Sequence, residues 1–254
     1  MSKIILKLVT LCFFLLFFSC NDEDLSESID SEILVKKIIV KNLANNTILR
    51  TDEFEYSGRK IVKGTSSAGS MAVYSYIGDF ISNIKIYDTN AILKLEYLYS
   101  YENNKLSQTI YKNYDTSTCE KRLYTYVSNT TLNFIYYTGD LVTQNTLYKS
   151  GTITLQDYEV IATTVQNHLN NFTSVSNFTY DNKNNAFKNV LGFNVLSVEL
   201  DRVGGVNKNL TVRENNNGGV ISFAYLNYTY NSNNYPTTLT IASSFDNNTS
   251  EYYY

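Results

Sequence analysis

The chain is poor in the residue types on which most catalytic and metal sites depend. Its 254 residues include one histidine, three cysteines, one proline and no tryptophan. With so few histidines and cysteines, a zinc site of ordinary ligand type cannot be assembled. A Ser-His-Asp triad would need His168, and no serine lies in a Gly-x-Ser-x-Gly turn. We therefore expect no catalytic, metal-binding or cofactor-binding residues and no cofactor, and we interpret His168 as a surface or turn residue.

The first twenty residues have the pattern of a secretory signal peptide. Lys3 and Lys7 flank the start of an apolar run, and residues 8–18 carry no charge. Such a run is too short to span a bilayer comfortably. With Ser19 before Cys20, the segment resembles a bacterial lipoprotein signal. The resemblance implies a signal peptide over residues 1–19, lipidation of Cys20 and membrane contact through this N-terminal lipid. The alternative is an ordinary signal cut elsewhere, or a poorly cleaved anchor.

Residues 20–32 have the composition of a disordered, solvated tether. Six of the 24 acidic residues lie in positions 21–32, and no lysine or arginine interrupts them. An acidic run beside a lipidated cysteine also resembles the surface-export signal of Bacteroidetes lipoproteins. The resemblance implies an outer-membrane, lipid-anchored protein that is exposed on the cell surface, although the tether composition alone explains the acidic run.

The rest of the chain, residues 33–254, is nearly neutral and is predicted to form a single β-rich domain. It holds 19 basic and 18 acidic residues, because two of the 21 basic residues belong to the signal. A neutral body does not attract phosphate backbones, so a nucleic-acid partner is disfavoured. Cys119 is its only cysteine, which excludes an intramolecular disulfide; we interpret this lone thiol as incidental.

The composition favours β structure, and a hairpin pattern recurs along the body. Tyrosine (23) and phenylalanine (13) are abundant, as suits a pleated, half-buried surface. The pattern is an aromatic-x-Tyr triplet, a few turn-forming residues and an apolar residue that opens a second run. The second tyrosines of the first copies are Tyr56, Tyr76, Tyr101 and Tyr126, and later copies end in Tyr180 and Tyr230. A period of this size indicates a repeat architecture.

We predict an all-β fold in which these hairpins form an antiparallel meander. The meander is expected to form a curled open sheet or a sandwich. The two rings of each triplet point to one face of a strand because side chains alternate with period two. The hairpins resemble YD (RHS-type) repeats of bacterial envelope proteins, most closely at residues 56–61 and 180–183. The resemblance implies an uncharacterised Bacteroidetes lipoprotein with degenerate YD-like hairpins, and it adds fold and location without an activity.

Two segments interrupt the pattern. Residues 157–173 allow either a short amphipathic helix or a strand pair. Helical spacing fits Val160, Ile161, Val165, Leu169 and Phe172, but the stretch from Ile161 to Val165 is rich in β-branched residues. The apolar residues 186–200 are interpreted as a loop packed on the sheet.

The tyrosine rows allow two functional interpretations. They can form the core and cross-strand ladder of the sheet, which their recurrence at every hairpin favours. They can instead form an aromatic face that binds a glycan or protein partner. The residues of this face are Tyr74, Tyr76, Tyr99, Tyr101, Tyr124, Tyr126, Tyr228 and Tyr230.

We predict an envelope lipoprotein that is a non-catalytic binding module for a glycan or a protein. A structural or scaffold role in the envelope is the first alternative. The second is a glycoside hydrolase with two carboxylates, since the body contains enough acidic residues for one. The sequence makes no prediction of oligomeric state.

Overall fold

The structure is a computed structural model that describes residues 33–200, 205–242 and 247–254. The predicted signal peptide, the lipidation site at Cys20 and the acidic tether lie outside the described residues. These remain predictions.

The described residues form sixteen β-strands and one short 3-10 helix. In chain order they are β1 (Lys37–Asn42), β2 (Ile48–Ser57), β3 (Lys60–Ser66), β4 (Ser70–Ile77), β5 (Phe80–Tyr87), β6 (Leu93–Glu102), β7 (Lys105–Asn113), β8 (Thr118–Tyr126), β9 (Thr131–Asp140), β10 (Gln144–Gln156), β11 (Glu159–Asn167), β12 (Phe172–Tyr180), η1 (Asn194–Leu196), β13 (Leu210–Asn217), β14 (Val220–Tyr230), β15 (Pro236–Ala242) and β16 (Asn247–Tyr253). Across these residues, no helix has the length and apolar character needed to cross a membrane.

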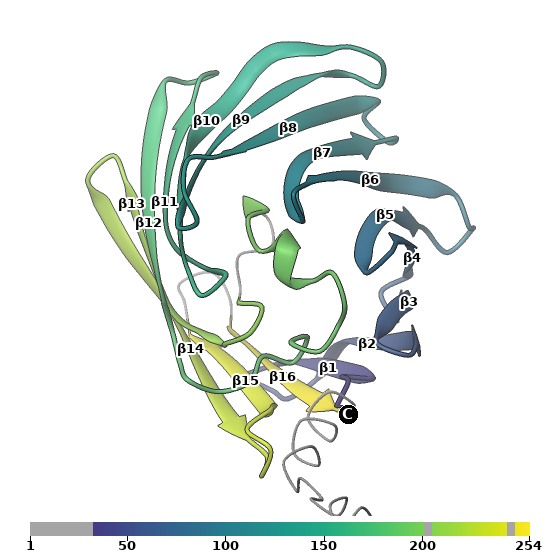
Figure 1. Cartoon of the computed structure of the whole chain (residues 1–254). Coiled ribbons are helices and arrows are strands. Elements are labelled where there is room, and N and C mark those ends of the chain that lie inside the picture. Colours follow the sequence, from purple (N-terminus) through teal and green to yellow (C-terminus); the bar gives the residue numbers. More distant parts are fainter. Residues whose placement is uncertain (1–32, 201–204, 243–246) are drawn as a thin grey trace, which may run out of the picture.

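The strands close into a barrel, so the prediction of an open sheet or sandwich is wrong. Each strand pairs antiparallel with its neighbours in sequence, and β1 pairs with β16 (Figure 1). The closing register runs from Lys37 opposite Tyr253 to Asn42 opposite Asn248. Closure satisfies the backbone groups that the first and last strands of an open sheet would expose. The interpretation as YD-repeat hairpins in an open sheet is wrong for the same reason.

The hairpin turns at one end of the barrel follow from local sequence. β6 and β7 are joined by Asn103 and Asn104, whose φ angles are 51° and 60°. Two consecutive positive φ values define the type I′ turn, whose twist matches that of paired strands. Gly58 and Gly78 adopt φ near 60° in the corresponding turns after β2 and β4. The Asn and Gly residues of the repeated pattern are therefore there for their backbone conformation.

The tyrosines of the pattern join neighbouring hairpins. The Tyr101 hydroxyl donates a hydrogen bond of 2.6 Å to the carbonyl of Ile81, just after the preceding hairpin's turn. Tyr180 makes the same bond to Val160, at 2.7 Å. At Tyr76 the direction is reversed, since its hydroxyl accepts from the amide of Ile61. The aromatic ring thus reaches across one hairpin to the next, which explains the spacing of the repeat.

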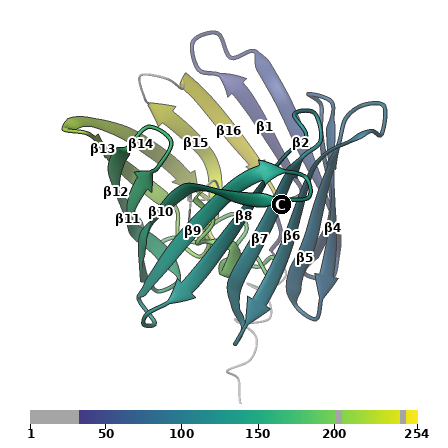
Figure 2. The ribbon, with the colours of Figure 1, turned by 90° about the horizontal axis from the view of Figure 1, so that it is seen from above.

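The buried core lies inside the barrel. Side chains on one face of each strand point inward, and Ile81, Leu106, Leu132 and Ile153 are fully buried there. Part of this core is supplied by the segment between β12 and β13, which folds into the interior (Figures 1 and 2).

The two segments that interrupt the hairpin pattern, residues 157–173 and 186–200, adopt different structures. Of the alternatives for residues 157–173, the structure forms the strand pair, in which Asn167 of β11 is opposite Phe172 of β12. Residues 186–200 pack on the inner side of the closed sheet. They lie within the barrel and include η1, because a closed barrel leaves an interior that apolar residues can fill.

Candidate functional site

The interior segment, residues 181–209, is the plug of the barrel; its described parts are 181–200 and 205–209. It leaves the wall at the end of β12 and returns at the start of β13, at the end where the Tyr-containing hairpins turn. There the amide of Leu191 donates to the Arg59 carbonyl at 3.0 Å, and the amide of Asn184 to the Asn234 carbonyl at 3.0 Å. These bonds tie the plug to the turns on either side of it.

Asn189 adds further hydrogen bonds between the plug and the rest of the barrel. Its side-chain amide donates to the Tyr235 hydroxyl at 2.7 Å and to the Ile33 carbonyl at 3.0 Å. Arg59 in turn donates to the Asn189 carbonyl at 2.9 Å. Both Asn189 and Tyr235 are buried, so these polar groups need the partners that they have.

A buried carboxylate, Glu199, attaches the middle of the plug to the wall. Glu199 is completely inaccessible to solvent. It accepts hydrogen bonds from the Arg122 guanidinium at 2.6 Å and the Tyr124 hydroxyl at 2.7 Å, and a further one from the hydroxyl of Thr109. Three donors from β7 and β8 converge on a single plug side chain. A buried charge requires this kind of pairing, since isolation in the interior would be costly.

Arg122 is held as closely as its partner. Its guanidinium lies 5.3 Å from the ring centre of Tyr111 and 5.1 Å from that of Tyr136. On its other side it donates to the Glu120 carboxylate at 2.8 and 3.0 Å. The guanidinium therefore interacts with two carboxylates and with the faces of two aromatic rings. It leaves Glu199 fully engaged, which suits an anchor better than a catalytic carboxylate.

A second carboxylate receives the plug where it returns to the wall. Glu159 of β11 accepts from the backbone amides of Val206, Asn207 and Lys208 at 2.7–3.3 Å. Burial raises the pKa of the Glu159 carboxyl, while the three amide donors act in the opposite direction. Near the exit from β12, Asp181 similarly accepts from the amide of Asn209 at 3.1 Å and from the Tyr230 hydroxyl.

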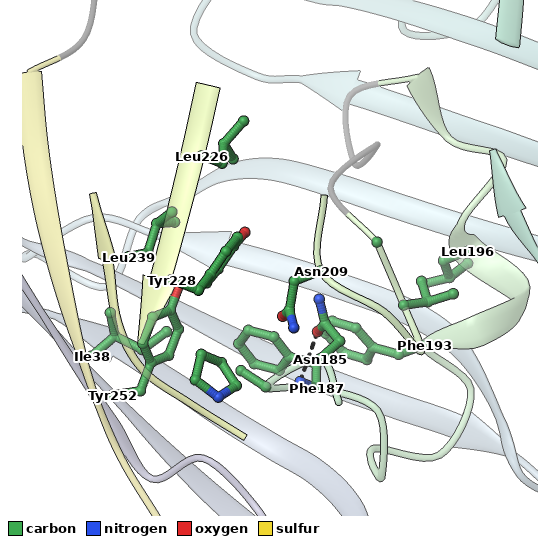
Figure 3. A pocket seen from close by; sticks show the side chains of 14 residues that line it. Ile38, Asn185, Phe187, Phe193, Leu196, Asn209, Leu226, Tyr228, Leu239 and Tyr252 are labelled. Atoms are coloured by element: carbon green, nitrogen blue, oxygen red, sulfur yellow. Dashed lines mark hydrogen bonds between the residues drawn. The ribbon is translucent and has the colours of Figure 1, made fainter. Parts of the chain in front are cut away.

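A cavity of about 360 Å³ lies between the plug and the wall formed by β14, β15, β16 and β1. The plug contributes Phe187 and Phe193, and the rings of Tyr228 and Tyr252 lie across the cavity from them (Figure 3). Its polar side chains are few. The lining residues are Ile38, Asn185, Ala186, Phe187, Phe193, Leu196, Gly205, Val206, Asn209, Leu226, Tyr228, Pro236, Leu239 and Tyr252. None of them is acidic, so the cavity does not hold the two facing carboxylates that glycoside hydrolysis requires.

The eight tyrosines of the predicted aromatic face all point into the barrel. Tyr74, Tyr76, Tyr99, Tyr101, Tyr124 and Tyr126 belong to the core or pack against it. Tyr228 lines the cavity, and Tyr230 holds Asp181. The structure thus brings one of the eight to the cavity and distributes the others around the interior.

Sequence reasoning did not identify most of the cavity residues. The two plug phenylalanines lie in the segment interpreted as a loop packed on the sheet. Ile38 and Tyr252 come together only because β1 pairs with β16. The sequence did contain a signal for Arg122, the partner of Glu199. Arg122 lies two residues before Tyr124, so the period-two alternation of a strand places both side chains on the same, inward face.

Neither Cys119 nor His168 belongs to this site. Cys119 is a free, buried thiol on the outward side of β8, and burial raises its pKa. His168 lies in the exposed turn between β11 and β12, where its ring nitrogen and the Ser150 hydroxyl are 2.8 Å apart.

The barrel resembles solved structures of porin-like proteins. One, from Bacteroides vulgatus, is 14% identical with a TM-score of 0.55, and the match covers 87% of this chain and 98% of that one. A second, from Bacteroides uniformis, is 13% identical with a TM-score of 0.52 and coverages of 86% and 97%. At this identity the likeness shows the fold alone. No family model matches the chain, and neither does any curated protein.

Proposed function

We propose that the protein is a non-catalytic binding module of the cell envelope that holds one or two rings of a small ligand, such as the end of a glycan, in the plug cavity. The observation that carries this proposal is the cavity itself. Its volume lies at the lower end of the range of about 300–1,000 Å³ for small-molecule sites. Tyr228, Tyr252, Phe187 and Phe193 line the cavity and offer aromatic surface for stacking.

The proposal includes lipid attachment at Cys20 and an outer-membrane position, with display on the cell surface. The support comes from the N-terminal sequence pattern, and the porin-like description of both structural neighbours is consistent with an envelope protein. The same neighbours favour a non-enzymatic role. A protein partner would not fit inside a cavity of this size, which is why the small ligand is preferred.

Thermal unfolding of the mature chain with free monosaccharides and their 4-nitrophenyl glycosides tests the proposal. A ligand at 100 times its Kd stabilises the folded state by about 2.7 kcal/mol, which is visible as a raised Tm. Ala186→Phe fills the cavity from the plug and should abolish this rise. Ala162→Phe, the same change on the outer face of β11, should leave it intact. A rise that survives Ala186→Phe, or no rise with any probe, would contradict ligand binding in this cavity.

A further inference from the structure

The outer wall of the barrel carries charged residues in a continuous row. In the described ladders, seven outward residues are directly opposite one another from β2 to β8. They are Glu55, Lys63, Val73, Lys85, Glu96, Lys112 and Cys119. Five of the seven carry a charge. The row therefore crosses nearly half of the circumference with charged side chains on the face that a transmembrane barrel would present to lipid.

These charges are paired with one another across the wall. The Lys63 ammonium lies 2.9 Å from the Glu55 carboxylate. Glu96 lies between two lysines, 3.8 Å from Lys85 and 3.9 Å from Lys112. Where β1 pairs with β16, Lys41 and Glu251 form an ion pair at 2.5 Å. Paired charges of this kind are ordinary on a surface in water.

A second row of polar side chains lies on the outer face of the following strands. Thr125, Asn133, Thr152 and Thr164 are exposed and lie directly opposite one another from β8 to β11. Glu214 is outward on β13, between Asn177 and Phe223. Exposed apolar side chains occur on several strands, as at Ile135 on β9 and Val175 on β12, and three follow one another on the outer face of β14: Ile221, Phe223 and Tyr225. A lipid-facing band has to continue around the whole circumference, and this patch does not.

Strand length leaves no room for a lipid band between the charged residues. A transmembrane β-strand takes about 9–11 residues to cross the hydrocarbon. β3 has seven residues and β5 has eight, so the hydrocarbon would cover their full length, Lys63 and Lys85 included.

The interior has the opposite character. Transmembrane barrels alternate apolar outside and polar inside. Here the inward face holds an apolar core that includes Ile81, Leu106, Leu132 and Phe134. The inside-out distribution of polarity is that of a barrel folded in water.

We propose that the barrel wall faces water, and that the chain is held at the membrane by its N-terminal lipid alone instead of spanning the bilayer as a pore. The membrane attachment rests on the lipid proposed above at Cys20, whereas the water-facing wall is independent of the cavity ligand, so the wall and the ligand can each fail without the other.

A protease site placed in the tether tests it in the full-length protein. A seven-residue tobacco etch virus protease site replaces residues 23–29, which lie outside the described barrel. Washed membranes carrying this protein are treated with the protease and centrifuged without detergent. We expect most of the barrel in the supernatant after cleavage and in the pellet without protease. The released barrel should elute as a discrete species and keep the β circular dichroism spectrum. A barrel that stays in the pellet after complete cleavage would overturn the proposal.

Two controls separate the outcomes. If the protein is already soluble before cleavage, the wall faces water, and it is lipidation at Cys20 that is wrong. The second control is the triple variant Thr125→Lys, Thr152→Lys and Thr164→Lys, which adds three charges to the polar row. A wall in water should tolerate them, with cell-envelope yield within twofold of the parent. A loss of yield of tenfold or more, with the matched Thr→Ser variant unaffected, would count against the proposal.

Discussion

The Arg122 guanidinium donates a hydrogen bond of 2.6 Å to the Glu199 carboxylate, which joins the barrel wall to the plug through an ion pair excluded from solvent. This pair crosses from β8 to the segment that fills the barrel. Its contribution to the free energy of unfolding is best measured by removing one of the two charges.

Glu199→Gln should destabilise the protein by about 3 kcal/mol. Removing one partner of a buried pair typically costs about 3–5 kcal/mol because the other charge stays buried. We expect the lower end because Arg122 retains Glu120 as a second partner. Urea unfolding measures the change. Glu251→Gln, which breaks the partly exposed pair with Lys41, is the control and should cost about 0–1 kcal/mol. Equal small losses in both variants would show that Glu199 does not anchor the plug.

Gly151→Ala should destabilise the barrel by at least about 2 kcal/mol, in the upper part of the range for overpacking. A Cβ atom at Gly151 would lie 1.8 Å from the Thr164 carbonyl oxygen, so the backbone must move. Gly64→Ala is the matched control. Its Cβ would come no closer than 3.5 Å to the ring of Phe54, and its cost should stay within about 0.5 kcal/mol. Thermal unfolding of the two variants compares them, and similar Tm values would contradict the close approach of β11 to Gly151 of β10.

Tyr101→Phe should cost about 1 kcal/mol, the usual net contribution of one hydrogen bond. The substitution keeps the ring and removes the donor to the Ile81 carbonyl. Tyr225→Phe serves as the control, because Tyr225 is half exposed on the outer wall. Chemical denaturation of both should separate them. Indistinguishable midpoints would mean that the tyrosine bonds between hairpins do not stabilise the repeat.

Stability should fall steeply in alkaline solution. Burial raises the pKa of Tyr76, Tyr126 and Tyr252 from 10.0 to about 12. The folded state therefore holds protons that the unfolded state releases. The stabilisation is fully present below pH 10 and is lost as the pH rises from about 10 through 12. The part of the tyrosinate absorbance that comes from buried side chains should rise together with the loss of the β circular dichroism. The double variant Tyr126→Phe and Tyr252→Phe should unfold at a higher pH. Ionisation of every tyrosine in the chain while the β circular dichroism is still intact would contradict the burial of these hydroxyls.

Local features of this fold were predictable because they depend on neighbouring residues. Asn103 and Asn104 indicate a hairpin turn whatever the overall fold, and the aromatic-x-Tyr triplet before them indicates a strand. The same pattern could not show closure. An open sheet and a barrel have the same hairpins, and they differ only in whether β1 meets β16.

The plug was unpredictable for a related reason. Its apolar residues would suit a surface loop packed on a sheet as well as a segment inside a barrel, and only the closed wall distinguishes the two. Glu199, a single acid within an apolar run, could be interpreted only once Arg122 was known to face it. Cavity residues such as Ile38 and Tyr252 are more than 200 positions apart, so no local pattern relates them.

The seam between β1 and β16 has a consequence for the order of folding. Every other strand pairing in the described barrel joins consecutive strands, whose contacts can form as soon as both have left the ribosome or the export channel. The seam joins Lys41 to Glu251, 210 positions later. Completion of the barrel must therefore wait for the final strand. A chain interrupted before Asn247 would keep two open edges, on β1 and β15, and would aggregate through them.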